Sequence, residues 1–159
     1  MKKNGFTLIE LMAVMVIMGL LILMIAPNLI KDYNESLIEA IVTQEENAVS
    51  ASKIFVEDYC LNPITDQYFQ KCPNRYKNAV NDKKYLCLSD IQNPPAVNAG
   101  MVPKPYIDNI SFKDEDCKGY ILFNKTSTGI YSDAKAYLVC GSEYETEGID
   151  KITYGECLN

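Results

Sequence analysis

The chain has 159 residues, a formal net charge of −6 and no histidine, with 48% hydrophobic and 23% charged residues. This composition is typical of a globular protein, and the acidic balance argues against direct nucleic-acid binding through a basic patch. Without histidine no Ser-His-Asp or Cys-His catalytic arrangement is possible, and no phosphate-binding glycine loop is present, so we expect neither an enzyme nor a cofactor or metal.

The first thirty residues contain a long apolar run that follows Lys2 and Lys3. No charged residue occurs from Leu11 to Ile30, and a helix of this length spans ~30 Å, the thickness of the hydrocarbon core of a membrane. A secretory signal peptide has a shorter apolar core of ~7–15 residues and a small-residue cleavage site, which is absent here. The run therefore predicts a membrane-spanning segment, and the two lysines predict that its N-terminus faces the cytoplasm.

One carboxylate, Glu10, stands near the start of this segment, where an ordinary membrane anchor gives it no role. Thr7 precedes it by three residues, which is the spacing of a capping box that satisfies backbone donors at a helix start. The capping role is one explanation of Glu10, and the flanking residues indicate a second.

The stretch from Gly5 to Glu10 resembles the processing site of type IV prepilins and pseudopilins. In that family a short basic leader ends in glycine, cleavage occurs before a phenylalanine, and a glutamate is the fifth mature residue. Gly5, Phe6, Glu10 and Pro27 all stand where the family pattern places them. The resemblance implies that a prepilin peptidase removes residues 1–5 and that the new α-amine of Phe6 is methylated.

The resemblance also implies how Glu10 acts in assembly. Cleavage creates an α-ammonium group on Phe6, and a carboxylate in apolar surroundings is tolerated when it is paired. If neighbouring helices stack with an axial offset, Glu10 of one copy meets the Phe6 ammonium of the next, and the homo-oligomer is an open helical filament. An inner-membrane assembly platform and its ATPase-driven machinery are the further partners that the resemblance implies.

Helical periodicity continues beyond Pro27. Neither glycine nor proline interrupts residues 28–59, and apolar residues recur there at spacings of three, four and seven. The members of this stripe are Ile30, Tyr33, Leu37, Ile41, Ala48, Phe55 and Tyr59. The sequence thus predicts one helix from about Phe6 to about Tyr59, bent at Pro27, with an amphipathic second half.

The remainder divides near residue 117. Residues 61–116 hold six of the seven prolines, so we expect loops there with one short helix or strand. Residues 120–123 and 136–140 are rich in aromatic and branched side chains and predict strands. Shorter strand segments are expected at 130–131 and 152–154. An antiparallel sheet packed on the second half of the helix gives an α+β fold, and pilins are similarly built.

Six cysteines lie beyond the apolar segment. They are Cys60, Cys72, Cys87, Cys117, Cys140 and Cys157. The sequence contains no Cys-x-x-Cys pair, which is the usual sign of a zinc or redox site. Structural disulfides are the better interpretation, and they indicate an oxidising location outside the cytoplasm. Many type IV pilins close a C-terminal surface loop with a disulfide, and by this resemblance Cys140–Cys157 is the expected pair. For the other four, the nearest pairs Cys60–Cys72 and Cys87–Cys117 are one option among several.

An acidic run, Asp114 to Asp116, is the remaining candidate for a metal site. Calcium takes about 6–8 oxygen ligands, and the spacing of an EF-hand is absent, so a solvated loop is the better prediction.

The resemblance implies a division of the chain and a route through the cell. Residues 1–5 are the leader, 6–30 form the transmembrane and filament-core helix, and 31–159 form an extracytoplasmic domain. We expect a single-pass precursor in the cytoplasmic membrane and a processed subunit in an extracellular pilus.

Several functions share such an N-terminus. The chain is predicted to be the main subunit of a type IV pilus that serves adhesion, twitching motility or DNA uptake. The alternatives are a minor pilin, a pseudopilin of type II secretion, and a tethered ectodomain that never polymerises. Three disulfides with a cysteine-closed loop favour a pilin, because major pseudopilins commonly have a calcium-bound loop in that place.

Overall fold

The structure is a computed structural model that describes residues 7–61, 66–79, 82–96 and 103–159, without the side chains of residues 25–27, 66 and 67. Contacts divide the chain into two compact units, Met1–Ala40 and Ile41–Asn159. The resemblance places the start of the extracytoplasmic domain at residue 31, and the larger compact unit starts at Ile41. Of the intervening residues 31–40, Leu37 is half-buried and the others are exposed.

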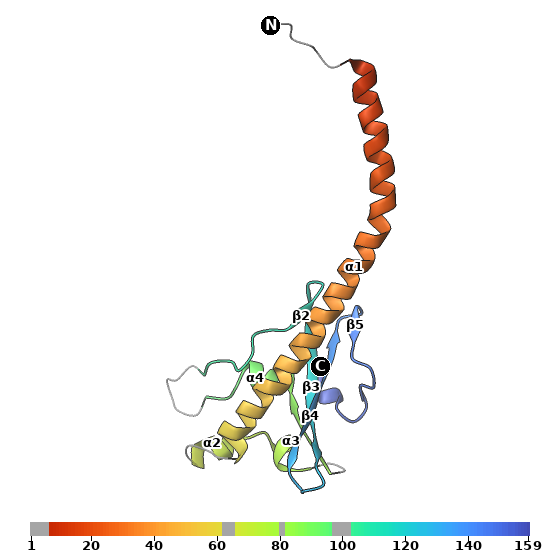
Figure 1. Cartoon of the computed structure of the whole chain (residues 1–159). Coiled ribbons are helices and arrows are strands. Elements are labelled where there is room, and N and C mark those ends of the chain that lie inside the picture. The colour runs from red at the N-terminus through yellow and green to blue at the C-terminus, as the bar shows by residue number, and fades with distance from the viewer. Residues whose placement is uncertain (1–6, 62–65, 80–81, 97–102) are drawn as a thin grey trace. The chain divides into compact units, whose positions relative to one another are not determined.

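Helix α1 runs from Leu8 to Val56 and is followed by the π-helical turn η1, Glu57–Leu61 (Figure 1). This agrees with the prediction of one long N-terminal helix. Among the described residues no single helix is long and apolar enough to cross a membrane, but the pair Leu8–Met24 and Asn28–Leu61, bent by 41°, qualifies by length and composition. The bend lies between Met24 and Asn28, in the segment that contains Pro27. Proline has no backbone N–H, so one helical hydrogen bond is missing there.

The apolar stripe of α1 is buried only in part. Ile41, Ala48 and Phe55 are buried, as the periodicity predicts, and Tyr59 in η1 is buried with them. The prediction is wrong for the first members of the stripe, since Ile30 and Tyr33 are each 63% exposed. Periodicity locates an apolar face but does not show how much of it another element covers.

The larger unit contains an antiparallel sheet with the strand order β1-β3-β4-β5, and β2 pairs with β3 as well. The strands are β1 Lys83–Cys87, β2 Ser111–Phe112, β3 Glu115–Lys125, β4 Tyr131–Cys140 and β5 Tyr144–Glu145. The short helices are α2 Asp66–Lys71, α3 Asn74–Lys77, α4 Leu88–Gln92 and the 3₁₀ turn η2 Gly155–Cys157. The predicted α+β architecture, with a long N-terminal helix, an antiparallel sheet and disulfides, is therefore confirmed.

Two local predictions differ from the structure. The region 61–116 contains more regular structure than expected, since α2, α3, β1, α4 and β2 all lie within it. The strand predicted at 152–154 is wrong, because these residues form a turn. The backbone N–H groups of Ile152 and Thr153 donate to Oδ1 of Asp150 at 3.0 and 2.9 Å, and such an Asx turn competes with strand pairing.

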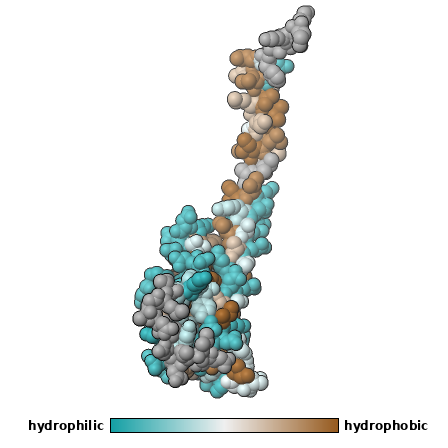
Figure 2. All heavy atoms as spheres, turned by 90° about the vertical axis from the view of Figure 1, so that its left-hand side faces the viewer, coloured by the Kyte–Doolittle hydropathy of each residue, from teal (hydrophilic) through white to brown (hydrophobic). Residues whose placement is uncertain are grey.

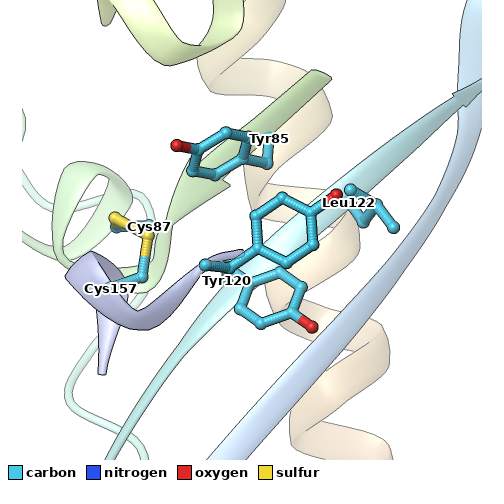
Figure 3. Close-up of a cluster of buried hydrophobic side chains, with 6 residues drawn as sticks. Tyr85, Cys87, Tyr120, Leu122 and Cys157 are labelled. Atoms are coloured by element: carbon cyan, nitrogen blue, oxygen red, sulfur yellow. A yellow bond between two sulfur atoms is a disulfide. The ribbon is translucent and has the colours of Figure 1, made fainter. Parts of the chain in front are cut away.

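The sheet is covered on both faces. Side chains alternate along β3, so that Ile121 and Phe123 point to the face on which α1 lies, and Tyr120 and Leu122 point to the opposite face. On that opposite face lies a buried cluster, the tyrosine cluster (Figure 3). Its members are Tyr85, Cys87, Tyr120, Leu122, Tyr154 and Cys157. The C-terminal segment thus completes the core beneath the sheet.

Candidate assembly site

The start of α1 is held by a reciprocal pair of side chains. The backbone N–H and the hydroxyl of Thr7 each donate to Oε2 of Glu10 at 2.9 Å, and the backbone N–H of Glu10 donates to Oγ1 of Thr7 at 3.4 Å. This is the capping box that the sequence predicts. Within the described residues Oε1 of Glu10 accepts no hydrogen bond, so the cap leaves one carboxylate oxygen for a cation.

Apolar side chains surround the first half of α1 (Figure 2). The large hydrophobic residues from Leu8 to Met24 are all exposed, Leu8 by 80% and Leu23 by 74%. The polar part of the helix begins beyond them with the exposed ion pair of Lys31 and Glu35 at 3.7 Å. An apolar surface of this extent needs lipid or protein around it.

The predicted processing residues Gly5 and Phe6 lie outside the described residues, and so does the side chain of Pro27. The cleavage site, the methylated amine and the pairing of that amine with Glu10 therefore stay predictions. Of the predicted assembly residues, Glu10 is the one whose side-chain contacts the structure describes.

A comparison with protein families decides what this segment is. Residues 1–26 match the family model described as the prokaryotic N-terminal methylation motif. The chain carries a type IV prepilin signature. The prepilin signature marks a pilin-like or pseudopilin protein and implies a membrane-anchored N-terminus, processing by a prepilin peptidase and entry into a membrane assembly machinery. No curated protein and no solved structure matches the chain.

Three disulfides staple the larger unit of this pilin-like chain. They are Cys60–Cys72, Cys87–Cys157 and Cys117–Cys140. The first matches one of the options that the sequence left open, and the other option, Cys87–Cys117, is not observed. The expected pair Cys140–Cys157 is wrong.

Strand register explains the observed pairing. Cys117 and Cys140 stand directly opposite each other in β3 and β4, with their Cα atoms 4.1 Å apart. Cys157 lies in η2 beside the end of β1, where its Cα atom is 5.0 Å from that of Cys87. The resemblance implied a disulfide from the C-terminal segment to β4. In the structure the disulfide of this segment goes to Cys87 at the end of β1.

Arg75, which sequence reasoning missed, organises the charges around the Cys87–Cys157 disulfide. Its Nη1 donates to Sγ of Cys87 at 2.7 Å and to Oε1 of Glu156 at 3.3 Å, and its Nε faces Oδ2 of Asp90 at 3.5 Å. The hydroxyl of Tyr85 donates to the same oxygen of Glu156 at 2.7 Å. Burial raises the pKa of Asp90, and the Arg75 charge opposes that rise. No local sequence signal links these residues, because the fold alone brings them together.

The same place offers three atoms with the chemistry of metal ligands. The sulfurs of Cys87 and Cys157 and a carboxylate oxygen of Glu156 all lie within 4.8 Å of one another. Both sulfurs belong to the disulfide, so neither is a thiolate that could bind a metal ion. We therefore assign this group a structural role.

A second network, partly buried, joins α1 to the edge of the sheet. Oε1 of Glu45 accepts hydrogen bonds from the hydroxyls of Tyr144, at 3.0 Å, and of Thr146. Oγ1 of Thr146 in turn accepts from the backbone N–H of Leu138 at 2.9 Å. Burial and the nearby Glu45 carboxylate raise the pKa of Tyr144. The network fixes the part of α1 that enters the larger unit against β4 and β5.

Proposed function

We propose that the chain is a structural, non-catalytic subunit of a type IV pilus. In this proposal it is cleaved after Gly5, methylated on Phe6, and polymerised into a helical filament that serves adhesion, motility or DNA uptake. The observation that carries the proposal is the prepilin signature at residues 1–26, within which a long helix begins at Leu8 with an apolar, exposed first half.

The apolar half of α1 gives such a filament its cohesion. In the membrane, lipid tails cover these side chains as well as protein does, so burial there does not drive association. Outside the membrane only other copies can cover them, and exposing one large aliphatic side chain to water costs about 1.5–3 kcal/mol. A filament with α1 at its centre is thus stable against dissociation into water.

Glu10 supplies register in this proposal. A carboxylate buried among apolar helices is costly without a cation, and the α-ammonium of a processed Phe6 on the neighbouring copy is such a cation. An uncleaved neighbour offers an amide in place of the ammonium, so the contact selects processed copies.

Processing is tested by replacing Gly5 with leucine in the native strain. We expect Gly5→Leu to leave a full-length, unmethylated precursor in the membrane, whereas wild type loses residues 1–5 and gains a methyl group on Phe6. Mass spectrometry of the N-terminal peptide measures both. Gly155→Ala, a change in open space within the larger unit, is the control that keeps normal processing. Mature protein from Gly5→Leu would contradict the proposal.

The role among pilin-like proteins is tested by electron microscopy of a deletion strain. Loss of all long surface filaments is the result expected for a main pilin. A strain that keeps filaments but loses secretion of folded proteins identifies a pseudopilin, and a few shortened filaments identify a minor pilin. Unchanged filaments and unchanged secretion, with the protein confined to the membrane, contradict assembly altogether.

A further inference from the structure

The two ends of the sheet carry opposite charge. At one end, β1 begins and β3 turns into β4, and α3 lies beside them; at the other end lie β2, the start of β3 and β5 (Figure 1). The first, which we name the lysine end, consists of Lys77, Lys83, Lys84 and Lys125, with Asp82, Asp133 and Asp150 nearby. The second, the acidic end, consists of Asp114, Glu115, Asp116, Glu143 and Glu145, with Lys113, Lys118 and Lys151 nearby.

At the acidic end, two of the three nearby lysines form local ion pairs with glutamates. Lys113 binds Glu143 at 3.1 Å, and Lys151 binds Glu145 at 2.5 Å. The three residues of the Asp114–Asp116 run are exposed and form no ion pair within the described residues. The excess negative charge of this end therefore faces outwards.

At the lysine end, aromatic rings hold two cations without neutralising them. Nζ of Lys84 lies 4.9 Å from the ring centre of Tyr76 and 4.6 Å from that of Tyr131. Nζ of Lys77 lies 4.9 Å from the ring centre of Phe69. Such contacts orient an ammonium group and leave its charge in place. Lys125 in addition forms an exposed ion pair with Asp82 at 3.8 Å, and such exposed pairs are weak. This end thus keeps an excess of positive charge, part of which is held in place by the aromatic rings.

Within one copy, the charges at the two ends are too far apart to interact. Strand β3 has 11 residues and connects the two ends, which at ~3.4 Å per residue places them ~35 Å apart. Physiological salt screens charges beyond ~8 Å, so the ends of one copy do not interact. The complementarity acts only between copies.

We propose that, in the filament, the lysine end of one copy docks on the acidic end of a neighbouring copy. This inference rests on the proposed pilus function and names the surfaces through which its subunits meet outside the helical core. A nucleic acid or another polyanion would use the lysine end alone and leave the acidic run without a partner. A head-to-tail contact between copies uses both ends, and where its rotation does not close a ring it propagates as an open filament.

The contact sets orientation more than cohesion. Exposed ion pairs are individually weak, but opposite charges on facing surfaces fix register and disfavour like-charged arrangements. The helical core therefore holds the filament together, and the charged ends align the outer domains.

Charge reversal in the full-length chain, expressed in the native strain, tests the contact. One variant carries Lys83→Glu and Lys125→Glu, a second carries Glu115→Lys and Asp116→Lys, and a third carries all four changes. We expect each of the first two to lower the yield of sheared filaments about tenfold, because like charges then meet at every contact. We expect the third, in which every contact is reversed in sign, to recover the wild-type yield.

Two further strains sharpen the test. Co-expression of the lysine-end and acidic-end variants is expected to restore filaments, because one has two acidic ends and the other has two basic ends. Lys53→Glu with Lys104→Glu is the matched control, since it makes the same charge change at exposed positions away from both ends. Retention of three disulfides in the membrane-bound protein shows that each variant folds. If a reversed variant fails to accumulate, Lys83→Gln with Lys125→Gln and Glu115→Gln with Asp116→Asn give the same comparison with a smaller loss.

The outcomes separate the two proposals. Wild-type yields from both reversed variants, or no recovery in the fourfold variant, overturn the head-to-tail contact and leave the pilus function standing. A loss confined to the lysine-end variant assigns that end to a different partner and also overturns it. Absence of filaments from the wild-type chain overturns the pilus function itself.

Discussion

Thr7 and Glu10 bind each other at the start of α1 through a single carboxylate oxygen, Oε2 of Glu10, which accepts both the backbone N–H and the hydroxyl of Thr7 at 2.9 Å. The capping role and the assembly role of Glu10 are therefore compatible. Each role depends on a different property of the side chain, because the cap needs an acceptor and assembly needs a negative charge.

Substitutions at these two residues separate the roles. Glu10→Gln keeps a capping residue and removes the charge, so we expect processed, methylated protein that does not polymerise. Thr7→Ala removes the cap, weakens the helix start by about 0.5–2 kcal/mol, and is expected to leave filaments. N-terminal mass spectrometry and the yield of sheared filaments measure the two steps. Normal filaments from Glu10→Gln together with none from Thr7→Ala would assign Glu10 to the cap alone.

The disulfides are expected to differ in their contribution to stability. Cys87–Cys157 joins residues 70 apart, whereas Cys60–Cys72 joins residues 12 apart. A chain-entropy estimate gives ~4.4 and ~2.9 kcal/mol for these loops. Thermal unfolding of the full chain in detergent should show a lower Tm for Cys87→Ser with Cys157→Ser than for Cys60→Ser with Cys72→Ser. Non-reducing peptide mapping checks the pairing, and a Cys140–Cys157 peptide would contradict it.

Gly119 is expected to tolerate no side chain. It lies in β3, where an added Cβ atom would stand 2.2 Å from the carbonyl oxygen of Tyr137 and 2.9 Å from Cδ2 of Leu138. Because the first contact is with the backbone of β4, the two strands must separate, and we expect Gly119→Ala to cost ~3 kcal/mol. Gly155→Ala meets no atom within 4 Å and serves as the control. Equal unfolding midpoints in denaturant for the two variants would refute this close approach.

Stability is expected to fall in alkaline solution. Burial raises the pKa of Tyr76 and of Tyr85 to about 12, and the pKa of Tyr106 is also raised, chiefly by burial. The folded chain thus holds phenol protons that the unfolded chain, with a tyrosine pKa of ~10, releases. This stabilisation is fully present below about pH 10 and is lost as the pH rises towards 12.

The free energy of unfolding, measured across this range by circular dichroism in denaturant, should decline above about pH 10. Tyr76→Phe should make the decline shallower, because one group with a raised pKa is removed. A variant whose decline is as steep as that of wild type would show that Tyr76 does not contribute.

The parts of the fold that follow from local sequence were predictable. The prepilin signature, the long helix and strands β3 and β4 depend on spacing and residue type, which are readable along the chain. The pairing of Cys87 with Cys157 was not predictable, because it depends on the position of η2 beside β1 in the folded chain. Arg75 was missed for the same reason, since its partners Asp90 and Glu156 approach it only in the folded chain. The apolar composition around Ile152 predicted a strand, but the segment forms a turn because the Asp150 carboxylate accepts a hydrogen bond from the backbone there.

The disulfide between Cys87 and Cys157 encloses the one between Cys117 and Cys140. If the chain is exported with its anchor first, as the proposed function implies, its sulfurs reach the oxidising side in sequence order, and Cys87 meets Cys117 before its native partner arrives. An oxidant acting on thiols as they emerge would close this premature pair. Its exchange for the native pairs needs a free thiolate to attack the wrong bond. For the exported subunit proposed above, maturation of this domain is therefore expected to need disulfide isomerisation as well as oxidation, and a host that can only oxidise is expected to accumulate mispaired subunits.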